Sequence, residues 1–257
     1  MAVQLFVDDG VAEVVLDDPG KLNALDESGL RELSDAFRRA ADAGVRALVL
    51  RGEGRAFCAG RDVSGVDPAT DDARGYLEDL LSPLMVQISE FPAPTFGVAT
   101  GACLGVGLGL LIAVDIVYVA DDAKIGSPFV NLGAALDSGG HSLFFERLGS
   151  HRALDLIVTG ELMSGTDAVA SGLFSRSVPP EEVLEFTHAR ARRAAEGPTA
   201  AFLVSKRLIR RLRDSRQGFW EAVADETDAQ VELSATVDYR EGFAAFHEKR
   251  RPVFRGE

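Results

Sequence analysis

Two turns of small residues, each directly after an apolar run that favours a buried strand, constrain the fold of this chain most strongly. The first, FCAGRD, covers residues 57–62, and the second, GACLGVG, covers residues 101–107. Small residues let backbone N–H groups approach a ligand oxygen, because no side chain stands in the way. Two such donors directed at one carbonyl oxygen would form an oxyanion hole, which stabilises negative charge on that oxygen.

The charge balance and the cysteine content limit the classes of partner. The chain carries a formal net charge of −13, which argues against a nucleic-acid partner because phosphate binding needs a basic face. The two cysteines, Cys58 and Cys103, have neither metal-site nor redox-motif spacing, and the four histidines also lack ligand spacing, so no metal site is expected. Since no secretory signal is visible, a reduced, cytoplasmic protein is the plain expectation.

The segment 96–120 is nearly all apolar and is the one candidate for a membrane helix. It contains five glycines and an internal Asp115, which argue against a lipid-facing helix. We therefore expect a buried strand, turn, helix and strand there, and no membrane partner.

The first two thirds of the chain alternate strands and helices. A hairpin is expected at 4–7 and 11–16, and Asp26 should cap a helix that Gly44 closes. The remaining expected elements are a strand at 45–50, a helix at 73–91 that Pro83 splits, a strand at 95–99, a helix from about 105 and a strand at 116–119. Because strand, glycine turn and helix recur, stacked ββα units are favoured over a simple doubly wound sheet.

Helices dominate the rest of the chain. Ser150 and Ser164 are expected to cap helices at 151–159 and up to Gly172. A last strand at 175–178 and helices at 198–213, 218–233 and 236–249 should follow. We expect a core at 1–196 and a C-terminal helical region at 197–257 that forms oligomer contacts.

Four motifs in order, residues 21–25 (KLNAL), 56–63 (AFCAGRDV), 101–115 and 168–173 (AVASGL), resemble the crotonase superfamily, the enoyl-CoA hydratase/isomerase group. The resemblance implies an α/β fold with a ββα spiral core and a C-terminal helical oligomerisation region. It implies a homotrimer, or a hexamer as a dimer of trimers. It also implies a coenzyme A thioester as substrate, as in fatty acid metabolism, and no permanently bound cofactor.

The resemblance also assigns site residues. The thioester oxygen would lie between the backbone N–H groups of Arg61 and Val106, and a helix that starts there would add its positive dipole end. Lys21 and Ala24 would lie beside the nucleotide portion of coenzyme A, and Ala59 beside its adenine. The full set of residues implied to bind coenzyme A or substrate is Lys21, Ala24, Leu25, Ala59, Gly60, Asp62, Val63, Gly105, Phe129, Leu132, Phe246 and Lys249.

The acidic residues at the family's catalytic positions indicate the type of reaction. Hydratases of the family use two glutamates, and the corresponding positions here are Gly109 and Phe129. Asp137, in LDSGGHS, instead resembles the acid of the Δ3,Δ2-enoyl-CoA isomerases and of the 1,2-epoxyphenylacetyl-CoA isomerases. One carboxylate suffices to move a proton beside a polarised thioester. We therefore predict an isomerase, with Asp137 as acid and base among the apolar residues Phe129, Leu132 and Leu136.

Several alternatives stay open. Asp137 could simply cap the next helix, or act as a nucleophile as in 4-chlorobenzoyl-CoA dehalogenase. The chain could hydrate enoyl-CoA with a different arrangement, or bind acyl-CoA without catalysis. His141 could face Asp137 or be a surface residue, and the Arg61 side chain could contact phosphate or solvent. A dinucleotide-binding enzyme fits less well, because Leu110 replaces the third glycine, and a serine hydrolase elbow is absent.

Overall fold

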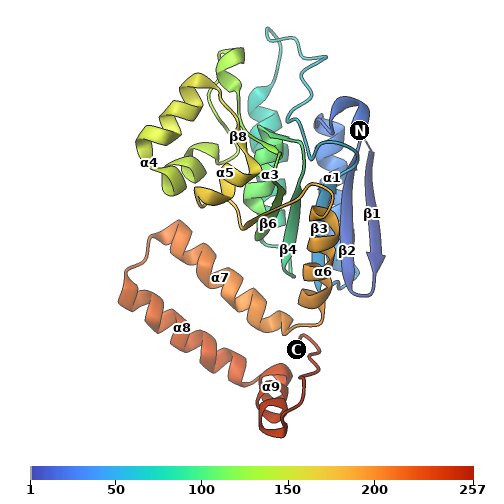
Figure 1. Cartoon of the computed structure of the whole chain (residues 1–257), viewed down its shortest axis with the longest axis vertical. Coiled ribbons are helices and arrows are strands. Elements are labelled where there is room, and N and C mark those ends of the chain that lie inside the picture. The colour runs from blue at the N-terminus through green and yellow to red at the C-terminus, as the bar shows by residue number, and fades with distance from the viewer. Residues whose placement is uncertain (1) are drawn as a thin grey trace.

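A six-stranded sheet with the strand order β1-β2-β3-β4-β6-β9 carries the core of the computed structural model, which describes residues 2–257 (Figure 1). The strands β1 and β2 form the predicted antiparallel hairpin, and every other neighbouring pair is parallel. Asp9 and Gly10 both have positive φ, as a two-residue hairpin turn requires. The strands are β1 (Ala2–Asp8), β2 (Val11–Asp17), β3 (Ala47–Gly52), β4 (Thr95–Ala99), β6 (Ile116–Ala120) and β9 (Arg176–Val178).

A second sheet of three short strands stands beside the first. Its order is β5 (Ala102–Leu104), β7 (Lys124–Gly126) and β8 (Met163–Ser164). The stretch predicted as one turn after β4 therefore contains a strand, which hydrogen bonds with β7 stabilise. The units β4-β5-α3 (Val106–Ala113) and β6-β7-α4 (Gly140–Thr159) follow each other as stacked ββα units, and this confirms the crotonase-like spiral core.

The first helices begin where local chemistry predicts. Asp26 caps α1 (Glu27–Asp42), since its Oδ1 accepts the Gly29 N–H at 2.7 Å. The expected helix around Pro83 is divided into a π-helix, η2 (Gly75–Leu81), and α2 (Ser82–Ser89), with the proline in the first turn of α2, where its missing N–H costs little. Short 3-10 turns occur at η1 (Pro19–Lys21) and η3 (Phe129–Leu132).

The helix expected at 151–159 is present, and it follows directly on an earlier helix. Both belong to α4, which begins at Gly140 with Gly139 as N-cap and is interrupted at Gly149, where φ is 74°. The whole helix α6 (Val183–Ala195) was not expected, and it packs on β3 and β4. By contrast, Ser164 caps α5 (Gly165–Ala170) as expected, because its Oγ accepts the Asp167 N–H.

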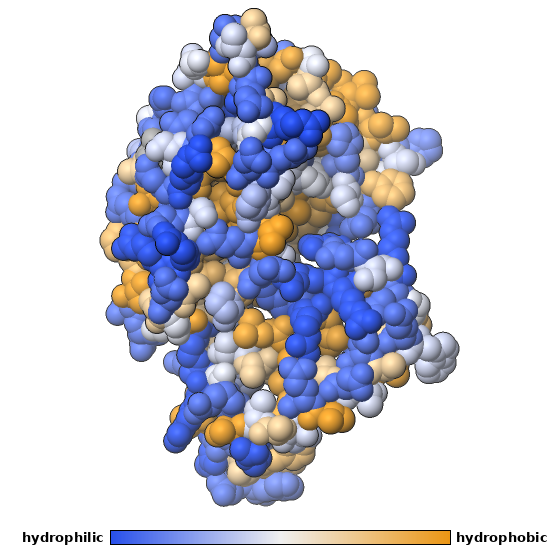
Figure 2. Space-filling model, turned by 180° about the vertical axis from the view of Figure 1, so that it is seen from behind, coloured by the Kyte–Doolittle hydropathy of each residue, from blue (hydrophilic) through white to orange (hydrophobic). Residues whose placement is uncertain are grey.

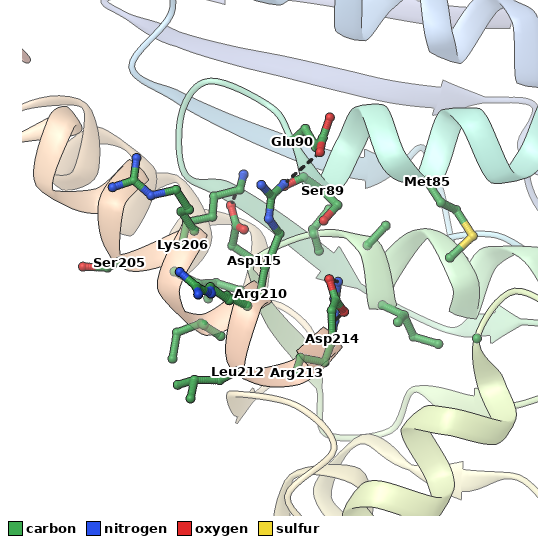
Figure 3. A pocket seen from close by; sticks show the side chains of 18 of the residues that line it. Met85, Ser89, Glu90, Asp115, Ser205, Lys206, Arg210, Leu212, Arg213 and Asp214 are labelled. Atoms are coloured by element: carbon green, nitrogen blue, oxygen red, sulfur yellow. Dashed lines mark hydrogen bonds and ion pairs between the residues drawn. The ribbon is translucent and has the colours of Figure 1, made fainter. Parts of the chain in front are cut away.

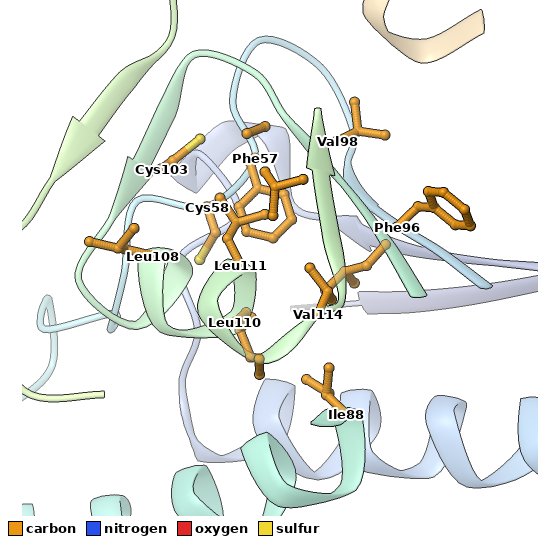
Figure 4. Close-up of a cluster of buried hydrophobic side chains, with 14 of the residues drawn as sticks. Phe57, Cys58, Ile88, Phe96, Val98, Cys103, Leu108, Leu110, Leu111 and Val114 are labelled. Atoms are coloured by element: carbon orange, nitrogen blue, oxygen red, sulfur yellow. The ribbon is translucent and has the colours of Figure 1, made fainter. Parts of the chain in front are cut away.

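The buried core joins the first turn to α2 and α3. Phe57 and Cys58 pack beside Leu108 and Leu111 of α3, with Ile88 of α2 below them (Figure 4). The segment 96–120 forms β4, β5, α3 and β6 inside this core, as expected. No helix within residues 2–257 has both the length and the apolar character needed to span a bilayer.

Three helices, α7 (Thr199–Ser215), α8 (Phe219–Ser234) and α9 (Val237–Glu248), extend away from the sheet (Figure 1). The division expected after residue 196 falls between α6 and α7. Apolar patches lie over these helices in Figure 2, and Phe219, Trp220 and Phe246 are each more than 70% exposed. Large exposed apolar side chains of this kind mark interaction surfaces.

Lys206 connects α7 to the core. Its Nζ lies 2.8 Å from Asp115 Oδ2 and donates to the carbonyl oxygens of Phe91 and Ala93, at 3.0 and 3.3 Å. Asp115 also accepts the N–H and the hydroxyl of Thr95. Burial lowers the pKa of Lys206, and Asp115 opposes that shift.

Replacing this buried lysine should loosen α7. We expect Lys206→Met to lower the free energy of unfolding by about 3 kcal/mol, because Asp115 then loses its cationic partner. Lys124→Met, at an exposed lysine of β7, is the control and should change it by less than about 0.5 kcal/mol. Urea unfolding followed by circular dichroism measures both, and equal effects of the two variants would contradict the anchoring role.

Candidate active site

The two glycine turns lie side by side because their backbones are hydrogen bonded. The N–H of Phe57 donates to Thr100 O at 2.7 Å, and that of Cys58 to Ala102 O at 2.9 Å. The N–H of Leu104 returns a bond of 2.9 Å to Cys58 O, so Cys58 and Cys103 form a parallel β-bridge. The two motifs, far apart in sequence, thus form one structural unit.

In each turn the predicted donor N–H is left without a backbone acceptor among the described residues. Gly60 O accepts the Leu25 N–H at 2.8 Å, so the N–H of Arg61, on the opposite side of the same planar peptide, points away from Leu25. Val106 is the first residue of α3, where a helix leaves its N–H groups unpaired. Within residues 2–257 neither N–H donates to another backbone group.

Two glycines with positive φ allow the turns to meet. Gly60 has φ 104° and Gly105 has φ 52°. A Cβ on Gly60 would lie 3.0 Å from Leu104 O and 3.7 Å from Val106 N, so a side chain there would enter the space between the two turns. The predicted donors therefore border the same space, and the N-terminal end of α3 adds partial positive charge to it.

The segment 21–25 runs alongside the first turn. Ala59 N donates to Leu22 O, and Asp62 N to Leu25 O, both at 2.9 Å. Lys21 Nζ lies 2.6 Å from Asp62 Oδ2 and is half-exposed, and this ammonium group holds the pKa of Asp62 well below its usual range. Leu25 is fully buried with its N–H and C=O both bonded, so it supports the site from behind.

The apolar side chains predicted to lie near the two turns differ in how far they are buried. The Phe129 ring packs over Gly105, since a Cβ there would lie 2.9 Å from Phe129 Cε1. Val63 is 50% exposed, and Leu132 is 68% exposed. The expectation that Leu132 helps to enclose Asp137 is therefore wrong, whereas Leu136 is buried as expected.

Asp137 lies in the loop before α4 and is half-buried. Its Oδ1 accepts the Ser138 hydroxyl at 2.6 Å. The helix cap is Gly139, with no side-chain hydrogen bond, so the interpretation of Asp137 as a capping residue is wrong. Asp137 precedes the helix and His141 is exposed, so no helical-turn pairing joins them.

Ser138 fills the position that a hydratase acid on α3 would need. A Cβ on Gly109 would lie 2.4 Å from Ser138 Cβ, closer than real carbon atoms approach. Ser138 has φ 54°, a left-handed conformation that is costly for a residue with a side chain. Strain of this kind is retained where the surrounding structure enforces it, and here it directs Ser138 Oγ to Asp137.

Phe246 and Lys249 do not reach the two turns of their own chain. They lie at the end of α9, which packs on α8 (Figure 1). The C-terminal tail beyond α9 bonds Arg46, which precedes β3, whereas the first turn follows the other end of β3. Within one chain these two residues therefore lie away from the turns, and their contact with coenzyme A stays a prediction.

Other candidate chemistries find little support. Burial raises the pKa of the Cys58 thiol to about 12 and also raises that of Cys103, so both stay protonated at neutral pH. In the described part of the chain no three His, Cys, Asp or Glu side chains cluster as metal ligands.

An open cavity of about 1310 Å³ lies between α7 and the core (Figure 3), but its lining includes none of Arg61, Val106 and Asp137.

Comparison with known proteins agrees with this geometry. A ββα spiral with paired glycine turns is the architecture of the crotonase superfamily. The sequence profile described as enoyl-CoA hydratase/isomerase matches residues 7–257, and the chain belongs to that family of enzymes. A Bacillus subtilis protein named a probable enoyl-CoA hydratase is 35% identical over 260 residues, covering 100% of this chain and 99% of the relative.

Two further relatives differ in their names. The 1,2-epoxyphenylacetyl-CoA isomerase of Escherichia coli is 31% identical over 257 residues, covering 98% of this chain and 97% of the relative. The crystal structure of an enoyl-CoA hydratase subunit I from Geobacillus kaustophilus superposes with a TM-score of 0.91 at 32% identity, covering 100% and 99% of the two chains. The family is therefore established, and its members carry both hydratase and isomerase names.

The contact between Gly109 and Ser138 can be tested by a double-mutant cycle. We expect Gly109→Ala to destabilise the protein by about 1–3 kcal/mol through overpacking. Adding Ser138→Gly should recover at least about 1 kcal/mol, because it removes the clashing Cβ. Ser138→Ala keeps that Cβ and loses only the hydroxyl, so it should give no recovery. Thermal unfolding measures all variants, and equal rescue by glycine and alanine would contradict the contact.

Proposed function

We propose that this chain is an enoyl-CoA isomerase that shifts a double bond, or opens an aryl epoxide, next to a coenzyme A thioester. In this proposal the N–H groups of Arg61 and Val106 bind the thioester oxygen, and Asp137 moves the proton. The observation that carries the proposal is the packing of Ser138 against Gly109. Ser138 occupies the space that the side chain of a hydratase acid on α3 would need. Asp137, the residue before it, is therefore the acid that this loop offers.

The proposed reaction needs one base and one site for negative charge. Asp137 removes a proton from the carbon next to the thioester carbonyl, and the electron pair moves onto the thioester oxygen as an enolate. The two N–H groups and the N-terminus of α3 stabilise that oxygen. Asp137 then returns the proton to the far carbon of the allylic system, and the double bond moves into conjugation. The same carboxylate is restored at the end.

The loop that carries Asp137 lies against the first turn of α3. Ser138, the next residue, packs on Gly109, and Gly109 lies about one helical turn after Val106. This contact supports assignment of the acid and of the Val106 donor to a single site.

Hydration is the second candidate function, favoured by relatives whose names say enoyl-CoA hydratase. It would require a water-activating group other than acids at the positions of Gly109 and Phe129. Acyl-CoA binding without turnover is the third. In each case coenzyme A belongs to the substrate, and we propose no resident cofactor.

Assembly and location are part of the same proposal. We propose a cytoplasmic homotrimer, or a dimer of trimers, in which Phe246 and Lys249 of one subunit reach the coenzyme A of another.

Light scattering should give three or six times the subunit mass. Lys249→Ala should weaken binding of coenzyme A esters about threefold to tenfold, as expected for a lost charge contact with phosphate. A monomer with full affinity would contradict this arrangement.

Removing the acid should stop double-bond migration. We expect Asp137→Asn to lower kcat on 3-enoyl-CoA by about 10² to 10⁴-fold, because the amide cannot shuttle the proton. The dissociation constant for a non-reacting acyl-CoA should change by less than about threefold, since binding uses other groups. Asp155→Asn, at an exposed position of α4, is the matched control.

The absorbance of the conjugated thioester follows migration, and mass spectrometry of 2-enoyl-CoA reports added water. Undiminished migration by Asp137→Asn would refute the assignment of the acid. Rapid hydration by that variant would favour the second candidate function.

A further inference from the structure

The Arg61 side chain is paired with another side chain of its own chain. Its guanidinium group binds both carboxylate oxygens of Asp71, with Nη1 2.9 Å from Oδ2 and Nη2 2.6 Å from Oδ1. About one fifth of each side chain is exposed. A bidentate pair of this kind fixes the orientation of both groups, which a single lysine contact would not do.

Tyr76 completes the contact. The Arg61 guanidinium carbon lies 4.1 Å from the centroid of its ring, within the range of a cation–π interaction. Tyr76 is 2% exposed, and its hydroxyl donates to Leu25 O at 3.1 Å. Because burial raises the pKa of Tyr76, the hydroxyl stays protonated and remains a donor at neutral pH.

These contacts form a closed set of interactions around one peptide unit. Leu25 O accepts both the Tyr76 hydroxyl and the Asp62 N–H, and Leu25 N donates to Gly60 O. The residues before and after Arg61 are therefore held by Leu25. The Arg61 side chain is held by Asp71 and Tyr76, and Tyr76 is itself bonded to Leu25. The peptide that carries the Arg61 N–H is thus fixed from both its backbone and its side chain.

This closed set of interactions also includes the segment before α2. Asp71 lies in the loop after the first turn, and Tyr76 lies in η2. The resemblance to the crotonase superfamily implies that residues between Val63 and Ile88 shape the acyl pocket, so this segment is expected to form part of that pocket. A change in its position would be transmitted through the Asp71 carboxylate and the Tyr76 ring to Arg61.

We propose that Asp71 and Tyr76 are positioning residues that orient the Arg61 N–H through the Arg61 side chain and couple the acyl pocket to the oxyanion hole. The proposal rests on the oxyanion-hole part of the proposed function and not on Asp137. An acyl group that displaces the segment 71–76 misorients the donor, so acyl selectivity is expressed in the rate as well as in affinity. Loss of a whole donor costs about 10² to 10³-fold in kcat, so misorientation should cost about tenfold.

The test uses a bound chromophore that does not react. A cinnamoyl-type CoA thioester absorbs at longer wavelength when its carbonyl oxygen is polarised, so the absorbance shift on binding reports the oxyanion hole without proton transfer. We expect Asp71→Ala to reduce this shift and to lower kcat about tenfold with a smaller change in KM. Asp71→Glu should restore much of both, because it keeps the carboxylate, and Tyr76→Phe should give an intermediate loss.

The matched control is Arg74→Ala, which breaks an exposed ion pair with Glu78 in the same segment. It should leave the shift and kcat unchanged. The proposal is overturned if Asp71→Ala shows the full shift and full kcat, if Arg74→Ala causes an equal loss, or if the unsubstituted protein shows no shift. A full shift without double-bond migration in the unsubstituted protein would refute the isomerase function and leave the positioning role intact.

Discussion

The parallel β-bridge between Cys58 and Cys103 is the contact on which the site depends. It is made of backbone hydrogen bonds alone, and it brings together two turns that different strands supply. Since the proposed oxyanion donors are also backbone groups, neither the Arg61 nor the Val106 side chain itself contacts the thioester oxygen in the proposal. Val106 is used for core packing, and Arg61 is available for the contacts with Asp71 and Tyr76.

Local chemistry made much of the fold predictable. The hairpin, the Asp26 cap and β4 follow from patterns within a few neighbouring residues. The strand β5 was missed because three residues become a strand only through pairing with β7. A helix after Asp137 was among the alternatives, but its capping residue was wrong, because Gly139 caps α4 without a side-chain bond. The missed helix α6 did carry a signal, since Val183, Thr187, Ala191 and Ala195 repeat at four-residue spacing and are all buried.

The site was predictable where the backbone carries the chemistry. Motif order predicted that the turns of Arg61 and Val106 and the segment 21–25 lie together, and the structure places them side by side. Their role as donors, and that of Asp137 as the acid, stays a prediction. Contacts between distant segments were not predictable, because nothing local in Gly109 indicates Ser138, and nothing local in Arg61 indicates Asp71. In the proposed assembly, the place of Phe246 and Lys249 depends on how subunits meet, which one chain does not contain.

The close approach of Ser138 to Gly109 has an evolutionary consequence. A glutamate at position 109 would be destabilising in this chain, because its Cβ would overlap that of Ser138. Replacing Ser138 with glycine would relieve the overlap but would remove the hydrogen bond to Asp137. With Asp137 as the proposed acid, adding a second acid on α3 therefore weakens the support of the first, and the least costly order of substitutions begins at position 138.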